Sequence, residues 1–260
     1  MKGNDERISL GKRLRKSGSF RCAGTLPNWR DYPNSVKEAV RNTQTIYYPS
    51  SFYEVLFESL GKTVFPSNYY SFMGNKIRQT GLFQLLGISH PRTRLYYGRR
   101  RLCRILNDFG FPFVAKTPVG SSQGTGVWLI RVEHDLRDYL KSHQPAYVQE
   151  YLPIDRDLRV VVIAGQVVHS YWRIQKSGDF RNNVSRGASI CYENIPDDAL
   201  EFAVDAANRC GFGEVGLDVC YFQNKYYILE ANMVYGLEGF RQVGLDIYQI
   251  LAELGDKREI

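Results

Sequence analysis

The chain has 260 residues, of which 43% are hydrophobic, 13% aromatic and 23% charged. This apolar share excludes a wholly disordered chain, because it can supply a core that offsets the entropy lost on folding. No stretch approaches the roughly 20 apolar residues of a membrane-spanning helix, and the first 20 residues lack the apolar segment of a secretory signal. We therefore expect a cytoplasmic protein with no membrane contact, built from two compact lobes or from one domain with a smaller one attached.

Cysteine usage and charge restrict the classes of site further. The five cysteines are odd in number and form no Cys-x-x-Cys pair, so neither a disulfide framework nor a zinc site is predicted and a reducing compartment fits best. The net charge of +7 suggests an anionic substrate or partner. Basic residues concentrate in residues 1–21, as an N-terminal arm, and in residues 92–104. No interleaved aromatic motif accompanies them, so nucleic-acid binding is disfavoured.

Hydrophobic periodicity predicts alternating strands and helices along the chain. Residues 45–66 show a strand, a short helix and a strand, which together are too short for a complete nucleotide-binding unit. Residues 73–87 predict an amphipathic helix with Ile77 and the three leucines that follow it on its apolar side. The later predicted elements are a strand at 113–116, a glycine-rich loop at 117–126, a strand from residue 127, a helix at 133–143, strands at 146–152, 158–164 and 166–172, a polar loop at 175–187, a helix from Pro196 to Gly211, a hairpin at 214–232 and a helix at 243–255.

Three polar residues interrupt the apolar strands of the hairpin at 214–232, where charge is normally excluded. If residues 223–225 form a three-residue loop, Asp218 falls opposite Glu230, and Asn232 lies on the same face by the strand period of two. Two carboxylates and an amide oxygen suit Mg²⁺ or Mn²⁺ bridging substrate phosphates. A loop of two residues would reverse the faces. The solvent-facing side of an edge hairpin would explain the same alternation.

A metal site of this kind requires groups that bind phosphate, and two segments offer them. Lys116 ends a strand, and the glycine- and serine-rich loop after it lets backbone N–H groups approach phosphate oxygens. No Gly-Lys-Ser/Thr follows, so this is not a Walker loop. The polar loop at 175–187 contributes Arg181 and Asn183, donors suited to a transferring phosphoryl group and to the oxyanion left on a carbonyl. Taken singly, the first segment is more often a flexible hairpin connection and the second a surface loop rich in turn-forming residues.

The order of these motifs resembles the ATP-grasp superfamily, and within it the RimK-type carboxylate-amine ligases. The resemblance covers residues 73–260 and implies an α/β (α+β) ATP-grasp fold. Two α+β lobes, residues 73–152 and 153–260, would clasp ATP, preceded by the basic arm and a shortened α/β segment in residues 1–72. The motifs are Asn75-Lys76, Lys116, Gly120 to Gly126, Gln149-Glu150-Tyr151, Asp157-Leu158-Arg159, Gly178 to Asn183, Asp218, Glu230-Ala231-Asn232 and Gly236 to Gly239.

The resemblance also implies ATP and Mg²⁺ (or Mn²⁺) as cofactors and gives each motif a role in binding them. The implied ATP-binding residues are Lys76, Lys116, Gly120, Ser121, Ser122 and Gly124 at the phosphates, Glu150, Tyr151 and Leu152 at the adenine, and Asp157 at the ribose. The implied metal ligands are Asp218, Glu230 and Asn232. The residues implied to stabilise the transferring phosphoryl group are Arg181, Asn183 and Arg159.

The implied enzyme is an ATP-dependent carboxylate-amine ligase. A substrate carboxylate would attack the γ-phosphorus of ATP, and an amine would convert the acyl phosphate to an amide, releasing ADP and phosphate without a protein nucleophile. The alternative is a nucleotide-gated or inactive ATP-grasp protein whose basic surface binds nucleic acid or an acidic peptide. Residues 232–235 read Asn-Met-Val-Tyr where the family has Asn-x-Ser-Pro. The identity of both substrates, each a small molecule or a peptide, therefore stays open, as does a homo-oligomer.

Overall fold

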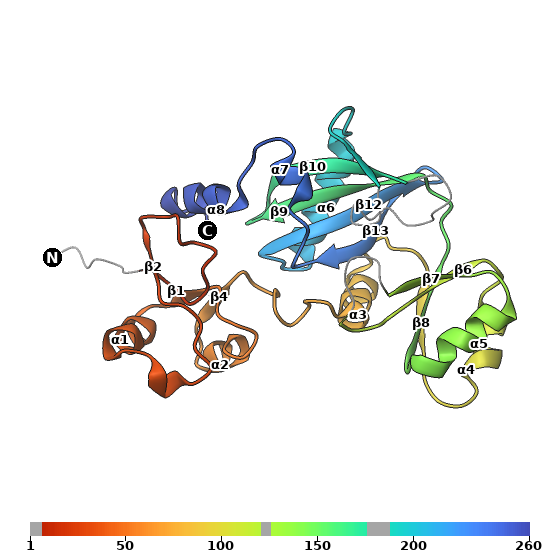
Figure 1. Cartoon of the computed structure of the whole chain (residues 1–260), viewed down its shortest axis with the longest axis horizontal. Helices are drawn as coiled ribbons and strands as arrows, with labels where there is room; N and C mark the ends of the chain where they lie inside the picture. The colour runs from red at the N-terminus through yellow and green to blue at the C-terminus, as the bar shows by residue number, and fades with distance from the viewer. Residues whose placement is uncertain (1–6, 121–125, 176–187) are drawn as a thin grey trace.

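The computed structural model describes residues 7–120, 126–175 and 188–260. The described chain forms one parallel and two antiparallel sheets, each with helices beside it (Figure 1). The parallel N-terminal sheet lies at one end, the five-stranded sheet in the middle, and the remaining four-stranded sheet at the other end. Within the described ranges, no helix combines the length and the apolar character needed to span a membrane.

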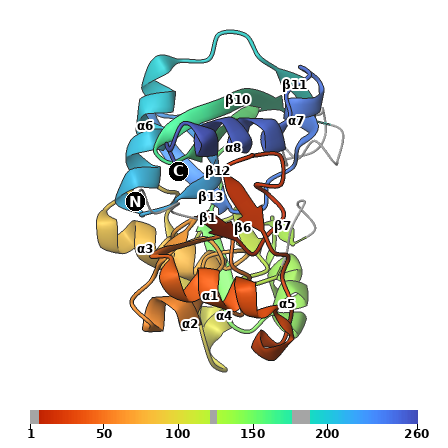
Figure 2. The same ribbon diagram turned by 90° about the vertical axis from the view of Figure 1, so that its left-hand side faces the viewer.

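The N-terminal sheet is parallel, with strand order β2-β1-β3-β4. Its strand–helix–strand unit at 45–66 confirms the predicted pattern. Residues 7–21, by contrast, are not a free arm, because they supply two strands and a connection whose Leu14 packs with Leu251 of α8. Figure 2 shows α8 lying beside this sheet. The elements are β1 (Arg7–Ser9), β2 (Phe20–Cys22), a 3-10 turn (Trp29–Asp31), α1 (Asn34–Asn42), β3 (Thr45–Tyr47), α2 (Glu54–Ser59), β4 (Thr63–Phe65) and, at the C-terminal end of the chain, α8 (Ile247–Asp256).

The second sheet is antiparallel, with strand order β5-β8-β6-β7. Two helices cover one face, and Ile105, Phe113 and Leu136 lie in the core between them and the sheet. The predicted strands at 113–116 and from residue 127, the helix and the strand after it are confirmed, whereas β5 and α4 were not predicted because they fall in the arginine-rich stretch. The elements are β5 (Thr93–Tyr96), α4 (Arg101–Asp108), β6 (Phe113–Lys116), β7 (Val127–Ile130), α5 (Glu133–Ser142) and β8 (Ala146–Glu150).

The five-stranded sheet is antiparallel and has the order β11-β10-β9-β12-β13. Its central strand β9 is buried on both faces, since Val160 packs in the core with α6 while Val161 packs in the core with α8. Both hairpins and the helix after Pro196 confirm the predictions. The elements are α3 (Lys76–Leu86), which precedes the second sheet in the chain, β9 (Arg156–Ile163), β10 (Gln166–Ile174), β11 (Ser189–Cys191), α6 (Asp197–Arg209), β12 (Glu214–Phe222), β13 (Lys225–Asn232) and α7 (Glu238–Arg241).

Helix α3 packs only partly as predicted, since Leu82 and Leu86 pack against the core and Leu85 does not. Leu85, expected on the buried side, is 87% exposed, and Lys76, Gln79 and Phe83 are buried instead. The amide of Gln79 donates to the Ala231 carbonyl at 2.7 Å and accepts from the Ala231 N–H at 3.4 Å. The helix is therefore attached to β13, although it lies within the predicted lobe of residues 73–152. The division of the chain at residues 72 and 152 stays a prediction.

Candidate active site

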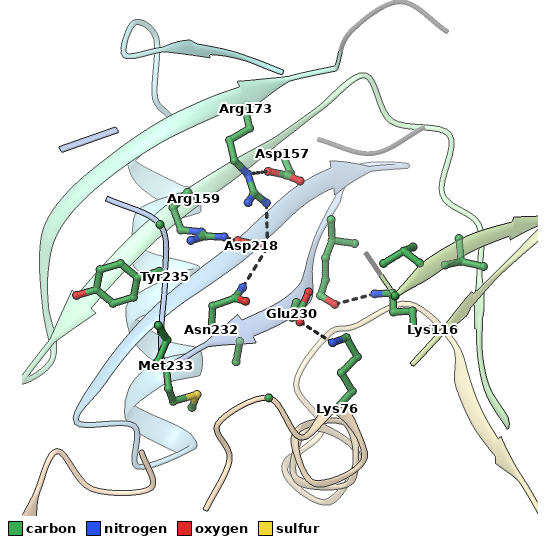
Figure 3. A pocket seen from close by; sticks show the side chains of 18 of the residues that line it. Lys76, Lys116, Asp157, Arg159, Arg173, Asp218, Glu230, Asn232, Met233 and Tyr235 are labelled. Atoms are coloured by element: carbon green, nitrogen blue, oxygen red, sulfur yellow. Dashed lines mark hydrogen bonds and ion pairs between the residues drawn. The ribbon is translucent and has the colours of Figure 1, made fainter. Parts of the chain in front are cut away.

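A cleft of about 1070 Å³ opens between the two antiparallel sheets (Figure 3). Strands β6 and β8 line one side, strands β9, β10, β12 and β13 line the other, and the start of α3 closes one end. Most of the charged residues singled out in the sequence lie on its walls. The cleft is therefore the candidate active site.

The hairpin of β12 and β13 reaches the expected register by an unexpected route. Its turn has two residues, Gln223 and Asn224, whose φ angles of 48° and 59° are typical of a type I′ turn. Such a turn alone would put the two carboxylates on opposite faces. A β-bulge with Leu229 as the extra residue shifts the register by one, so Asp218 stands opposite Glu230.

Asp218 lies at the centre of a buried charge network and not on a solvent-facing side, since it is only 6% exposed. Arg159 Nε donates to its Oδ1 at 2.6 Å, Arg173 Nη2 lies 2.9 Å from its Oδ2, and Asn232 Nδ2 donates to Oδ2 at 3.2 Å. Arg173 Nε also donates to Asp157 at 2.6 Å. Burial alone would raise the pKa of Asp218, but the two guanidinium groups outweigh it and lower that pKa. Asp218 is therefore ionised.

Arg173 is the residue of this network that sequence reasoning missed. The strand was predicted to end one residue earlier, at Trp172, and the cross-strand partner of Arg173 was unknown. In the structure Arg173 pairs with Asp157 across β9 and β10, and a bulge after Val167 sets that register. An arginine at the end of a predicted strand, in phase with Tyr171 on the same face, was the available signal.

Two lysines reach the cleft from different elements. Lys76 is the first residue of α3, and its Nζ lies 3.0 Å from Glu230 Oε1. Lys116 ends β6, and its Nζ donates to the Leu229 carbonyl at 3.4 Å. Burial lowers the pKa of Lys116, and the charge of Glu230 partly offsets this. The two ammonium groups thus enter the cleft from separate elements.

The glycine-rich loop begins beside Lys76. The Lys76 N–H donates to the Pro118 carbonyl and the Gly120 N–H donates to the Gly74 carbonyl, both at 3.0 Å. Gly74 and Gly120 have φ angles of 62° and 77°, a conformation that favours glycine. The structure thus brings the start of the predicted glycine-rich loop next to the N-terminal end of α3. The predicted site residues outside the described ranges are Ser121, Ser122, Gly124, Arg181 and Asn183.

The predicted adenine pocket lies along the end of β8. Glu150, Tyr151 and Leu152 all line the cleft. The Glu150 N–H donates to the Arg92 carbonyl at 2.9 Å, and its carboxylate accepts from the Arg92 N–H at 2.5 Å. Because that carboxylate is used within the protein, we expect the backbone and apolar side chains to face the adenine.

The predicted metal ligands are of the kind that a divalent cation takes. Asp218, Glu230 and Asn232 offer hard oxygen donors on neighbouring strands and converge on the cleft (Figure 3). Among the described residues, no group of three or more His, Cys, Asp or Glu side chains could hold a metal ion. Phosphate oxygens and water would therefore complete the coordination, as is usual for Mg²⁺. The role of all three residues stays a prediction.

Comparison with known proteins identifies the family. Residues 73–254 match the family described as the RimK-like ATP-grasp domain. The chain belongs to this family. It is 29% identical to a probable alpha-L-glutamate ligase 2 of Pseudoalteromonas atlantica, over 69% of this chain and 62% of the relative. It is also 29% identical to N-acetylaspartylglutamate synthase A of Homo sapiens, over 69% of this chain and 49% of the relative. The chain thus spans about half to three fifths of the length of these curated relatives.

Solved structures share the fold. ATP-grasp ligase PsnB, complexed with minimal precursor, Mg and ADP, superposes with a TM-score of 0.67 at 17% identity, over 98% of both chains. A RimK domain protein of Sphaerobacter thermophilus gives a TM-score of 0.65 at 14% identity, over 95% of this chain and 98% of the other. At such low identities the likeness shows the fold alone, and it confirms the expected ATP-grasp fold.

Proposed function

We propose that this ATP-grasp protein is an ATP- and Mg²⁺-dependent carboxylate-amine ligase. The observation that carries the proposal is the convergence of Lys76, Lys116, Asp218 and Glu230 on one cleft from separate elements. The cleft therefore contains both lysines that can bind phosphate and carboxylates that can bind a divalent ion. Relatives whose names describe glutamate ligases support the same chemistry.

The residues of the cleft divide into two groups by charge. Lys76 and Lys116 bind the nucleotide phosphates, and Arg159 and Arg173 stabilise the charge on the transferring phosphoryl group. Asp218, Glu230 and Asn232 would hold Mg²⁺, which would supply charge neutralisation at the nucleotide phosphates. No side chain has to form a covalent bond, because positioning and charge neutralisation lower the barrier.

The reaction has two steps that balance without a further reactant. A carboxylate oxygen of the first substrate forms a bond to the γ-phosphorus while the bond to the ADP oxygen breaks. The amine nitrogen of the second substrate then attacks the acyl carbon, the phosphate leaves, and the amine proton passes to solvent. The products are an amide, ADP and phosphate.

We propose L-glutamate as the first amine substrate to test, because relatives are named as glutamate ligases. The carboxylate substrate is a small molecule or a peptide, and the PsnB complex with its precursor peptide supports including peptides. All five cysteines are free thiols, which supports a reducing compartment for the enzyme.

The first test is the shift in melting temperature caused by a non-hydrolysable ATP analogue, with and without Mg²⁺. Ligand at about 100 times its dissociation constant adds about 2.7 kcal/mol to the free energy of unfolding. We expect a Mg²⁺-dependent shift in the wild type that Lys116→Ala loses. Lys141→Ala is the matched control, because that lysine is exposed on α5 in the same sheet layer. No shift in the wild type would refute the nucleotide site.

The second test is turnover. ADP release is measured with L-glutamate and pooled carboxylates, and the amide product is identified by mass spectrometry. Glu230→Ala is expected to abolish ADP release. Unchanged turnover in that variant would contradict the metal site.

The described basic residues give little support to the alternative of a basic binding surface. Arg13 pairs with Glu214 and Lys16 pairs with Asp246, so both serve the fold. Arg94 likewise pairs with Asp108. A complex with duplex DNA or RNA that weakens steeply with salt would revive that alternative.

A further inference from the structure

A fully buried carboxylate lies outside the cleft, four residues before Asp218 on β12. Glu214 has no exposed surface, and a charge in such a place costs free energy unless it is paired. It accepts hydrogen bonds from the Tyr48 hydroxyl at 2.8 Å, from the Tyr235 hydroxyl at 2.7 Å, and from the Arg13 guanidinium. All of its charge is therefore used within the protein.

The three partners of Glu214 come from separate parts of the chain. Arg13 lies in the connection between β1 and β2, and Tyr48 directly follows β3, so both are carried by segments next to the strands of the N-terminal sheet. Tyr235 follows β13 and lines the cleft. The Arg13 guanidinium also lies 5.7 Å from the ring centroid of Tyr48 and 6.0 Å from that of Tyr235. Glu214 thus joins the N-terminal sheet to one wall of the cleft.

The ring of Tyr235 is seated by a glycine of β12. A Cβ atom at Gly216 would lie 2.9 Å from Tyr235 Cβ, so only glycine leaves room for this residue. Glu214, Gly216 and Asp218 alternate along β12, and the strand period places all three on one face. The face of β12 that carries Asp218 therefore also carries Gly216, which leaves room for Tyr235, and Glu214, which binds its hydroxyl.

The segment of residues 232–237 carries Tyr235 and forms part of the cleft wall. All six of its residues line the cleft, from Asn232 at the end of β13 to Leu237 before α7. The Tyr235 hydroxyl donates to Glu214 at 2.7 Å and accepts from Arg13 Nη2 at 3.4 Å, so charged groups link this segment to the N-terminal sheet. Here the chain has bulky residues where the family it resembles has a small polar turn.

The contacts among Arg13, Glu214 and the two tyrosine hydroxyls persist at ordinary pH. Burial opposes the charge of Arg13, but the attraction of Glu214 outweighs it and the pKa of Arg13 is raised. Burial, and then the charge of Glu214, raises the pKa of Tyr48 and of Tyr235 well above the usual value. Both hydroxyls therefore remain protonated donors.

We propose that Arg13 and Glu214 are positioning residues that hold the Tyr235 hydroxyl and thereby set the 232–237 wall of the cleft from the N-terminal sheet. The wall then selects which substrate the cleft accepts, and it orients Asn232 for its predicted role as a metal ligand. This part of the proposal rests on the proposed function. The coupling between the N-terminal sheet and the wall does not depend on the proposed function. The N-terminal sheet then contributes to the geometry of the cleft, although it does not line it.

Two tyrosines on the same carboxylate provide a matched test. Tyr235→Phe and Tyr48→Phe each remove one hydroxyl from Glu214, and both side chains are buried. Hydrogen–deuterium exchange is measured on the full chain for peptides covering residues 232–237 and, as an internal reference, strands β6 and β8. We expect Tyr235→Phe and Arg13→Met to raise exchange in 232–237 by about tenfold, as for the loss of one buried hydrogen bond to a charge, with the reference unchanged. Tyr48→Phe is expected to leave 232–237 unchanged, and Arg13→Lys to restore part of the protection.

A second measurement connects the wall to the site. The Mg²⁺ concentration that half-saturates binding of the non-hydrolysable ATP analogue AMP-PNP should rise several-fold in Tyr235→Phe, whereas the affinity without Mg²⁺ should not change. Equal exchange in the two Tyr→Phe variants, or a rise spread evenly over the chain, would overturn the proposal, because Glu214 would then act only on overall stability. Failure of the wild type to bind AMP-PNP would contradict the proposed function alone, and the exchange data would still decide the coupling.

Discussion

The ion pair between Lys76 and Glu230 leads to a prediction about metal dependence. The Nζ and Oε1 atoms are 3.0 Å apart, and the two side chains are 5% and 25% exposed. Glu230 thus pairs with Lys76, which is proposed to bind the nucleotide phosphates, and the negative charge of Glu230 repels those phosphates. With a divalent ion present, the same carboxylate serves as a ligand. Glu230→Gln should therefore strengthen nucleotide binding without metal and weaken it with metal.

The geometry sets the size of the effect. Two unit charges 3.0 Å apart attract by about 5.5 kcal/mol at an effective dielectric constant of about 20. Desolvation and the ordering of both side chains offset most of this, and a partly exposed pair retains about 1 kcal/mol. Metal-free affinity should therefore rise by a factor of about 5 to 10. Loss of one carboxylate ligand should reduce the gain in affinity from Mg²⁺ by about 10-fold to 100-fold.

The assay is calorimetric titration of AMP-PNP in EDTA and in MgCl₂. Glu238→Gln is the matched control, because Glu238 also lines the cleft but lies near Arg241 and not near Lys76. The two variants change the net charge equally. Weaker metal-free binding in Glu230→Gln, or equal strengthening in both variants, would refute the reasoning, since overall charge and not the ion pair would then control binding.

Three further predictions concern stability and pH. Gln79→Ala should lower the free energy of unfolding by about 1 to 3 kcal/mol in a urea titration, because two buried backbone groups of β13 lose their partner. Gly239→Ala should lower the melting temperature, since its Cβ would lie 2.3 Å from the Tyr171 ring, whereas Gly236→Ala meets nothing within 4 Å and should not. Burial lowers the pKa of His169 below its usual 6.5, so its contribution to stability is present above that pH and is lost as the pH falls through the folded-state pKa. Acidification should therefore lower the melting temperature of the wild type more than that of His169→Gln.

Much of the fold and of the site chemistry could be predicted from local sequence. The strand at 113–116, the helix after Pro196 and both late hairpins followed from hydrophobic period and turn residues. Carboxylates inside apolar strands identified Asp218 and Glu230 as candidates. The order of short motifs identified the ATP-grasp family, because each motif needs only a few adjacent residues.

Helix α3 shows where local reasoning failed. Its leucine spacing predicted a buried apolar side, but Leu85 is exposed and the side with Lys76 and Gln79 is buried. Leu82 and Leu86 pack against the core as expected, but a helix that lines a polar site also buries polar residues, so apolar periodicity describes only part of its buried surface. The same reasoning missed Arg173, whose partner on β9 depends on a bulge after Val167 in its own strand β10.

The sequence by itself thus determined the types of element, the family and the chemistry of the side chains, because each depends on residues close together in the chain. Tertiary structure decided the geometry of the cleft. The bulge at Leu229 brings Glu230 opposite Asp218 in spite of a two-residue turn, and the contact of Arg13 with Glu214 joins segments about 200 residues apart. Register and long-range pairing depend on which surfaces bury one another, and no local pattern carries that information.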